Sequence, residues 1–116
     1  MVSQRQFRDL ALGMEGTTQT PHFDRAAFRV LRIYATLAAD GKTANLKLEP
    51  DEQNLRVEMH PEAFAPVSGG WGRQGWTTVT LAKVSKGVLE DALRAAWSQA
   101  IQKSPSKRRR TTNKKA

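Results

Sequence analysis

The last helical segment of the sequence constrains the fold more than any other feature. Between Ser85 and Pro105, apolar residues recur at the spacing of one wide helix face. The stripe consists of Val88, Leu89, Ala92, Leu93, Ala96, Trp97, Ala100 and Ile101. A helix with so broad an apolar face has to bury it against another layer of the protein. Ser85 is a favourable N-cap and Pro105 stops a helix, so the sequence predicts a C-terminal helix docked on a sheet, with Trp97 in the contact.

Two further helices are expected. A capping box formed by Ser3 and Gln6 begins a predicted helix over residues 4–13. Pro50 begins a shorter helix, because proline is favourable in the first turn and acidic residues follow it. The apolar residues of this inserted helix are expected to face inward, namely Leu55 and Met59.

Alternating segments predict a sheet between these helices. Apolar and polar residues alternate over 28–30, 33–37, 46–48 and 76–84, whereas residues 17–21 and 66–75 are expected to be loops. The alternation changes parity at Leu31-Arg32, which predicts a turn or bulge, and Asp40-Gly41 is a hairpin turn signal. The predicted fold class is α+β: an antiparallel sheet packed against N- and C-terminal helices, with a short inserted helix.

Positive charge is concentrated at the C-terminal end of the chain. The sequence of 116 residues has 19 Lys and Arg against 11 Asp and Glu, a net charge of +8. Residues 103–116 hold seven of the basic residues and no acid, which leaves twelve basic and eleven acidic residues, a net of +1, in residues 1–102. The sequence therefore predicts one folded domain over 1–102 and a disordered basic tail over 103–116.

Composition narrows the environment and the chemistry. The sequence has no cysteine, so it can form neither disulfides nor thiolate metal sites. No apolar run approaches the roughly 20 residues of a membrane span, and the first residues lack the apolar stretch of a signal peptide. We therefore expect a cytoplasmic protein without a membrane partner, and take it to be a monomer.

Two segments resemble catalytic or cofactor motifs without meeting their requirements. Residues 70–75 match G-x-G-x-x-G, but a strand pattern follows them, whereas a dinucleotide site needs a helix N-terminus there. His22, Asp24 and His60 offer two histidines and a carboxylate, yet a chain of this size provides no barrel for an iron site. We expect no catalytic residues, no metal and no cofactor, and hence no enzyme.

The glycine-rich segment and the basic residues are candidates for nucleic-acid binding. Trp71 and Trp76 flank Arg73 and could stack on bases, while cationic residues of the predicted sheet share its outward face: Arg29, Arg32, Lys47 and Lys83. Alternatively, one or both tryptophans cover the sheet and the charges are simply solvated. Both interpretations remain open. In the tail, non-specific phosphate contacts are expected from Lys107, Arg108, Arg109 and Arg110.

Several runs occur in an order that resembles a known family. They are Ala11–Gly16, Pro21-His22-Phe23, Phe28-Arg29-Val30, Ala35-Thr36-Leu37, Leu46–Gln53, Trp71–Thr77 and Ala96-Trp97. Together they are similar to the MmcQ/YjbR family over roughly residues 5–101, and the basic tail lies outside the pattern. The resemblance implies a frataxin-like α+β fold, sometimes described as a double wing, and a DNA-binding label. It supplies no catalytic residues.

The expected function is therefore non-catalytic binding of nucleic acid, and of DNA in particular. The basic tail would supply non-specific phosphate contacts. The alternative is a protein-interaction or small-ligand-binding module, which the nearly neutral body of the domain favours.

Overall fold

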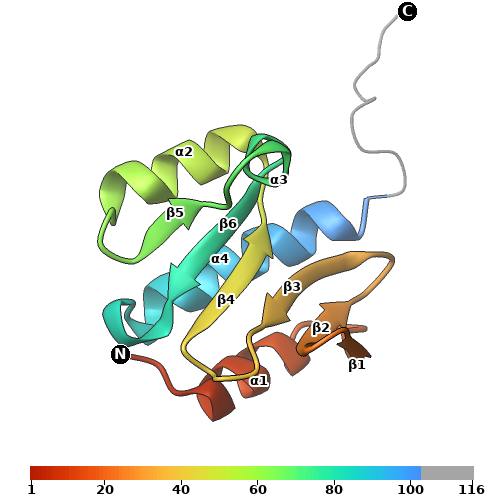
Figure 1. The fold of residues 1–116 in the computed structure, drawn as a ribbon. Helices are drawn as coiled ribbons and strands as arrows, with labels where there is room; N and C mark the ends of the chain where they lie inside the picture. Colours follow the sequence, from red (N-terminus) through yellow and green to blue (C-terminus); the bar gives the residue numbers. More distant parts are fainter. Residues whose placement is uncertain (103–116) are drawn as a thin grey trace, which may run out of the picture.

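The protein folds into two layers, a six-stranded antiparallel sheet and a helical layer on one of its faces (Figure 1). The computed structural model describes residues 1–102. The strand order is β1-β2-β3-β4-β6-β5. The strands are β1 Thr18–His22, β2 Arg25–Arg29, β3 Ile33–Leu37, β4 Thr43–Lys47, β5 Phe64–Pro66 and β6 Trp76–Thr80. The helices are α1 Gln4–Leu12, α2 Pro50–Met59, α3 Gly70–Arg73 and α4 Lys86–Ala100, with the 3-10 turn η1 Leu81–Lys83.

The core lies between the sheet and the helices α1 and α4. Leu89 and Leu93 of α4 are completely buried, as are Leu46 and Val79 on the sheet. Phe7 of α1 meets Phe28 of β2 edge to face, with the ring centroids 5.6 Å apart. Five of the eight residues of the predicted stripe are fully buried: Leu89, Ala92, Leu93, Ala96 and Ala100. Val88 and Trp97 are partly buried, and Ile101 is 38% exposed, so its expected place in the buried stripe is wrong. The α+β architecture predicted from the sequence is confirmed. Among the helices of residues 1–102, none packs over the centre of the sheet face opposite α1 and α4 (Figure 1).

The helix ends follow the expected local chemistry. The Ser3 hydroxyl accepts from the Gln6 amide and the Gln6 side chain accepts from the Ser3 amide, so the capping box is present. The Ser85 hydroxyl accepts from the amide of Val88 and caps α4. Trp97 is only partly buried, because its indole lies at the margin of the core and donates to the backbone oxygen of Glu15 at 2.8 Å. Trp97 therefore takes part in the docking of α4 at the margin of the core, without being fully buried.

Two segments differ from the expected strand pattern. Residues 18–22 form β1, not a loop, although β1 is almost entirely exposed and contains Pro21. It is an edge strand, where polar residues and proline are tolerated and no apolar alternation develops. The predicted strand over 76–84 ends at Thr80, since η1 begins at Leu81. The predicted loop over 66–75 contains the last residue of β5 and the helical turn α3.

The inserted helix α2 presents a different face from the one expected. It lies beside β5 at the edge of the sheet (Figure 1). Leu55 and Met59 are 47% and 59% exposed, so the expectation that they face inward is wrong. The buried residue of α2 is Gln53, whose polar side chain gave no signal in an apolar pattern.

Among residues 1–102, no helix is both long enough and apolar enough to cross a membrane.

Candidate functional site

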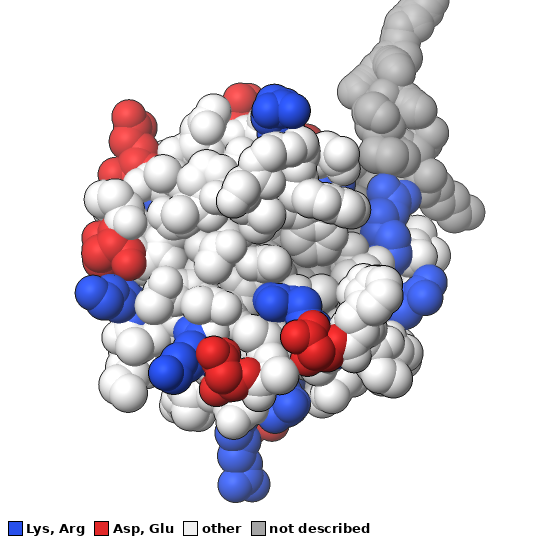
Figure 2. Space-filling view, in the orientation of Figure 1, with Lys and Arg blue, Asp and Glu red and all other residues white. Residues whose placement is uncertain are grey.

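The uncovered face of the sheet has a biased charge. Side chains alternate between the two faces of a strand, and Phe28 of β2 lies in the core. Arg25 and Arg29 therefore lie on the uncovered face, as do Lys47 and its cross-strand partner Trp76. None of the six strands contains an acidic residue. The strands therefore carry cationic residues and no acidic ones. Figure 2 shows that most of the face it views is uncharged, and that acidic groups lie close to some of the Lys and Arg side chains.

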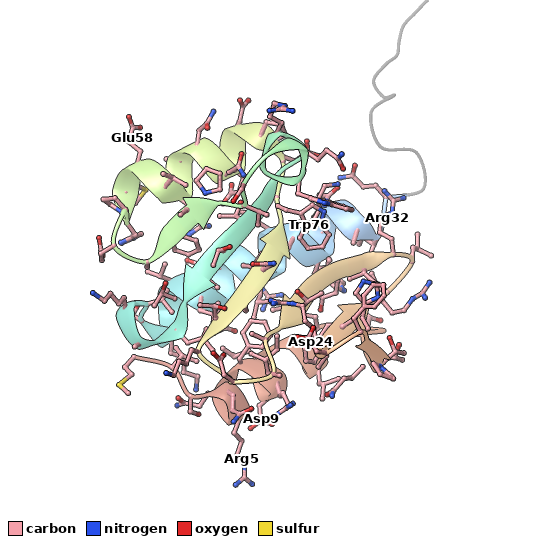
Figure 3. The ribbon with its side chains drawn as sticks, viewed as in Figure 1. Arg5, Asp9, Asp24, Arg32, Glu58 and Trp76 are labelled. Atoms are coloured by element: carbon pink, nitrogen blue, oxygen red, sulfur yellow. The ribbon has the colours of Figure 1, made fainter. Side chains whose placement is uncertain are left out.

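A pocket of about 390 Å³ opens on this face. Its lining comes from five strands, the segment after β5 and α3: His22, Arg25, Ile33, Thr36, Asn45, Val67, Trp71 and Trp76. Figure 3 shows the Trp76 ring on the side of the sheet that faces the viewer, away from α1 and α4. Trp71 is 62% exposed at the rim, whereas Trp76 is partly buried in the wall. The pocket therefore combines indole surfaces with polar groups.

Arg25 is the most unusual group in the pocket. Its Nε–H donates to the Thr36 hydroxyl at 2.8 Å. Its Nη2 is buried and has no hydrogen-bond partner among the described residues. Within residues 1–102 no carboxylate lies within salt-bridge distance of this guanidinium group. A buried donor without an acceptor typically costs about 1–3 kcal/mol, and more for a charged group, so an acceptor bound here would relieve that cost.

The remaining polar groups of the pocket also offer donors. The Asn45 Oδ1 accepts from the Thr78 hydroxyl at 2.9 Å, so the Asn45 amide nitrogen is left for a ligand. The Thr36 oxygen accepts from Arg25, which leaves the hydroxyl hydrogen of Thr36 to donate. A ligand that matches these groups has several acceptor oxygens and a flat apolar body.

The segment that contains both tryptophans is fixed by buried contacts. Gln53 of α2 donates through Nε2 to the backbone oxygens of Gly72 at 3.0 Å and Trp76 at 3.2 Å. A Cβ on Gly72 would lie 1.9 Å from the backbone oxygen of Val67. A Cβ on Gly75 would lie 1.9 Å from the backbone oxygen of Leu48. Gly75 also has φ +106°, which side chains disfavour. The glycines of this segment therefore permit close backbone packing.

The turn between β1 and β2 adds an exposed aromatic ring next to the pocket residue His22. Phe23 is 92% exposed and has φ +59°, an unfavourable conformation for a bulky residue. Its ring stacks edge-on against His22, with centroids 4.8 Å apart. Strain of this kind concentrates at functional sites.

The predicted binding residues are only partly brought together. Trp71 and Trp76 line the pocket, and Arg29 and Lys47 share its face. Arg32 lies in the β2–β3 connection, where its Nη2 donates to the Gln102 oxygen at 2.6 Å (Figure 3).

Two other predicted residues lie elsewhere. Arg73 is exposed on α3 and does not line the pocket. Lys83 is not on the sheet at all, because β6 ends before it, and it lines a separate pocket with His60 and Glu62. Lys107, Arg108, Arg109 and Arg110, and the predicted disorder of the tail, lie outside the described residues.

Sequence reasoning missed Arg25, Asn45 and the pocket role of His22. The sequence signal that could have identified Arg25 is its spacing of two residues from Ala27 and four from Arg29. This spacing places all three residues on one face of the sheet, because β2 begins at residue 25. His22 and His60 line different pockets, so the weak two-histidine pattern is not assembled in space.

The family match follows the same segments. The YjbR family model matches residues 12–99. The chain belongs to the YjbR family. The characteristic runs Leu46–Gln53 and Trp71–Thr77 meet in the structure, since Gln53 bonds to the second run and the Leu48 amide donates to the Gly75 oxygen at 3.0 Å.

Two solved structures share the fold. A Deinococcus radiodurans protein with a DUF419 domain superposes with a TM-score of 0.74 at 23% identity, covering 93% of this chain and 88% of that one. A Pseudomonas syringae protein superposes with a TM-score of 0.63 at 17% identity, covering 83% of this chain and 97% of that one. At these identities the likeness concerns the fold alone. No curated protein matches the sequence.

Proposed function

We propose that this protein binds nucleic acid, DNA in particular, through the uncovered face of its sheet and does so without catalysis. The observation that carries the proposal is a sheet with three cationic residues, no acidic residue and a pocket walled by two tryptophans. Cationic side chains attract phosphates, and aromatic side chains on an open sheet stack on bases. The proposal includes a frataxin-like, double-wing fold, which the resemblance to the family implies.

The basic tail complements this face. Residues 103–116 carry seven positive charges. Each phosphate that a cation neutralises releases condensed counterions, which supplies affinity without sequence preference. The folded domain, with its net charge of +1, contributes local contacts more than long-range attraction. The tail therefore supplies affinity, and the sheet face orients the bound strand.

A small-ligand module is the second candidate function. The specific observation in its favour is the pocket of about 390 Å³, which falls within the range of roughly 300–1,000 Å³ found for ligand sites. Arg25, whose Nη2 has no hydrogen-bond partner within residues 1–102, would suit a free ligand that bears a carboxylate. Such a ligand would bind with an affinity that the tail does not influence.

The salt dependence of binding tests the proposal. We would measure the affinity of the full chain for labelled oligonucleotides by fluorescence anisotropy at several salt concentrations. A second chain would have the four tail residues 107–110 changed to glutamine, which should flatten the slope of log affinity against log salt by up to about 3–4 for duplex. Arg29→Gln should then weaken the residual binding further. Absence of any salt-sensitive binding by the full chain would refute the proposed function.

A further inference from the structure

We infer that the pocket on the uncovered face receives one unpaired base, so that the protein prefers single-stranded to duplex nucleic acid. The inference rests on the proposed function and adds to it a strand preference and the place of one nucleotide. Three features carry it: the size and lining of the pocket, the excess of donors within it, and the exposed aromatic residues at its rim.

The size and lining of the pocket suit one flat ring. A volume of about 390 Å³ lies at the small end of the range for ligand sites. Ile33, Val67 and the indoles of Trp71 and Trp76 supply apolar walls. In a duplex both faces of each base are covered by neighbouring bases, so only an unpaired or extruded base can lay its face on an indole. The walls therefore select for a single strand.

The donors in the pocket select the kind of base. Asn45 offers its amide nitrogen, Thr36 its hydroxyl hydrogen, and Arg25 the N–H groups that no residue of 1–102 accepts. Thymine and uracil present two carbonyl oxygens, whereas adenine presents none. A rotation of the guanidinium group toward the opening would let Arg25 bond to a carbonyl or phosphate oxygen of the same nucleotide. The pocket thus favours thymine or uracil.

The rim can contact the neighbouring bases. Trp71 is 62% exposed at the pocket opening, and Phe23 is 92% exposed in the turn that follows His22. Exposed rings on rigid supports lose little entropy on stacking. Trp71 is supported by the contacts of Gln53 with its segment, and Phe23 by a two-residue hairpin turn. A strand whose base enters the pocket therefore has aromatic surface available beside it.

The test compares four octamers with the full chain at one salt concentration: oligo-dT, oligo-dA, an abasic strand with the same phosphates, and a duplex. Stacking contributes about 1–3 kcal/mol per base, which corresponds to about 5- to 150-fold in affinity. We expect oligo-dT to bind tighter than the abasic strand by a factor in this range, and tighter than oligo-dA and the duplex. Indole fluorescence should be quenched by oligo-dT and not by the abasic strand.

Two variants locate the base. Asn45→Asp keeps an oxygen for the Thr78 hydroxyl but replaces the donating amide by an acceptor, so oligo-dT affinity should fall at least fivefold, an effect of about 1 kcal/mol. Asn54→Asp makes the same chemical change on an exposed position of α2 and is the matched control. Should Asn45→Asp fail to fold, Trp71→Ala replaces it, because the exposed indole contributes little to the core.

The outcomes separate the inference from the proposed function. Equal binding of oligo-dT, the abasic strand and the duplex would overturn the inference and leave nucleic-acid binding standing. An equal loss from Asn45→Asp and Asn54→Asp would overturn the assignment of the base to this pocket. Failure of every octamer to bind would overturn both.

Discussion

Gln53→Glu tests whether the buried glutamine fixes the segment with the two tryptophans. The substitution preserves shape but removes the Nε2 donor that bonds to the backbone oxygens of Gly72 and Trp76. Gln53 is 6% exposed, so water cannot replace the donor freely. Each of the two carbonyl oxygens keeps a backbone donor, Gly75 N–H for Gly72 and Val67 N–H for Trp76, so the loss is that of two hydrogen bonds at about 0.5–1.5 kcal/mol each. An ionised carboxylate facing these oxygens adds a desolvation cost. We expect the free energy of unfolding to fall by about 2–4 kcal/mol at pH 7.

The pH dependence of this loss distinguishes it from a simple packing defect. Burial next to carbonyl oxygens raises the pKa of the introduced carboxyl group, and a protonated carboxyl can donate one of the two lost bonds. The deficit relative to the natural chain should therefore be smallest below the ordinary pKa of glutamate and should grow as the pH rises through the raised pKa.

Urea unfolding at pH 4.5 and pH 7, followed by circular dichroism, measures both values. Gln74→Glu introduces the same charge on an exposed residue of the same segment and is the matched control. A loss below 1 kcal/mol at pH 7, or equal losses for the two variants, would show that the hydrogen bonds of Gln53 do not fix this segment.

Three further perturbations follow from buried contacts. Leu93→Ala should cost about 2–5 kcal/mol, and more than Trp97→Ala, because Leu93 is fully buried and Trp97 is not; the reverse order in urea unfolding would contradict this docking of α4. Gly75→Ala should lower the free energy of unfolding by at least about 2 kcal/mol, because Gly75 has a positive φ and a backbone oxygen beside it. Gly87→Ala lies in open space on α4 and should raise the free energy of unfolding by about 0.5–1 kcal/mol. Similar changes in melting temperature for the two variants would refute the distinction. Burial raises the pKa of Tyr34 above its ordinary value of 10.0, against the opposing effect of the bond with the Thr17 hydroxyl. The neutral phenol therefore stabilises the fold below about pH 10, and this contribution is lost as the pH rises through the raised pKa. Tyr34→Phe should show a shallower fall in stability at alkaline pH, and an unchanged fall would exclude this tyrosine as its source.

The elements that the sequence predicted best are those whose buried faces are apolar. The stripe of α4, the capping box of α1 and the Asp40-Gly41 turn all have local chemistry that determines the structure. β1 was not predicted because an edge strand pairs with a single neighbouring strand and needs no alternation of apolar residues. The inward face of α2 was misjudged for a related reason: a polar side chain, Gln53, fills the buried position by bonding to backbone oxygens.

The candidate site was predictable in part. Trp71, Trp76 and Lys47 were identified because aromatic and cationic residues are the groups that contact nucleic acid. The pocket itself brings together residues far apart in the chain, and no spacing rule relates His22 to Asn45 or Val67. Lys83 was misplaced because the alternation of residues 76–84 continues into η1, where the chain has already left the sheet.

The two margins of the sheet determine how another molecule can approach it. β5, at one margin, is three residues long, contains Pro66 and has α2 beside it. β1, at the other margin, contains Pro21, which has no N–H to offer an incoming strand. Both margins therefore resist strand addition, and with it the edge-to-edge association that leads to aggregation. The broad face can therefore stay exposed while the margins disfavour association through strand addition. A partner has to bind on this face rather than add a strand to the sheet.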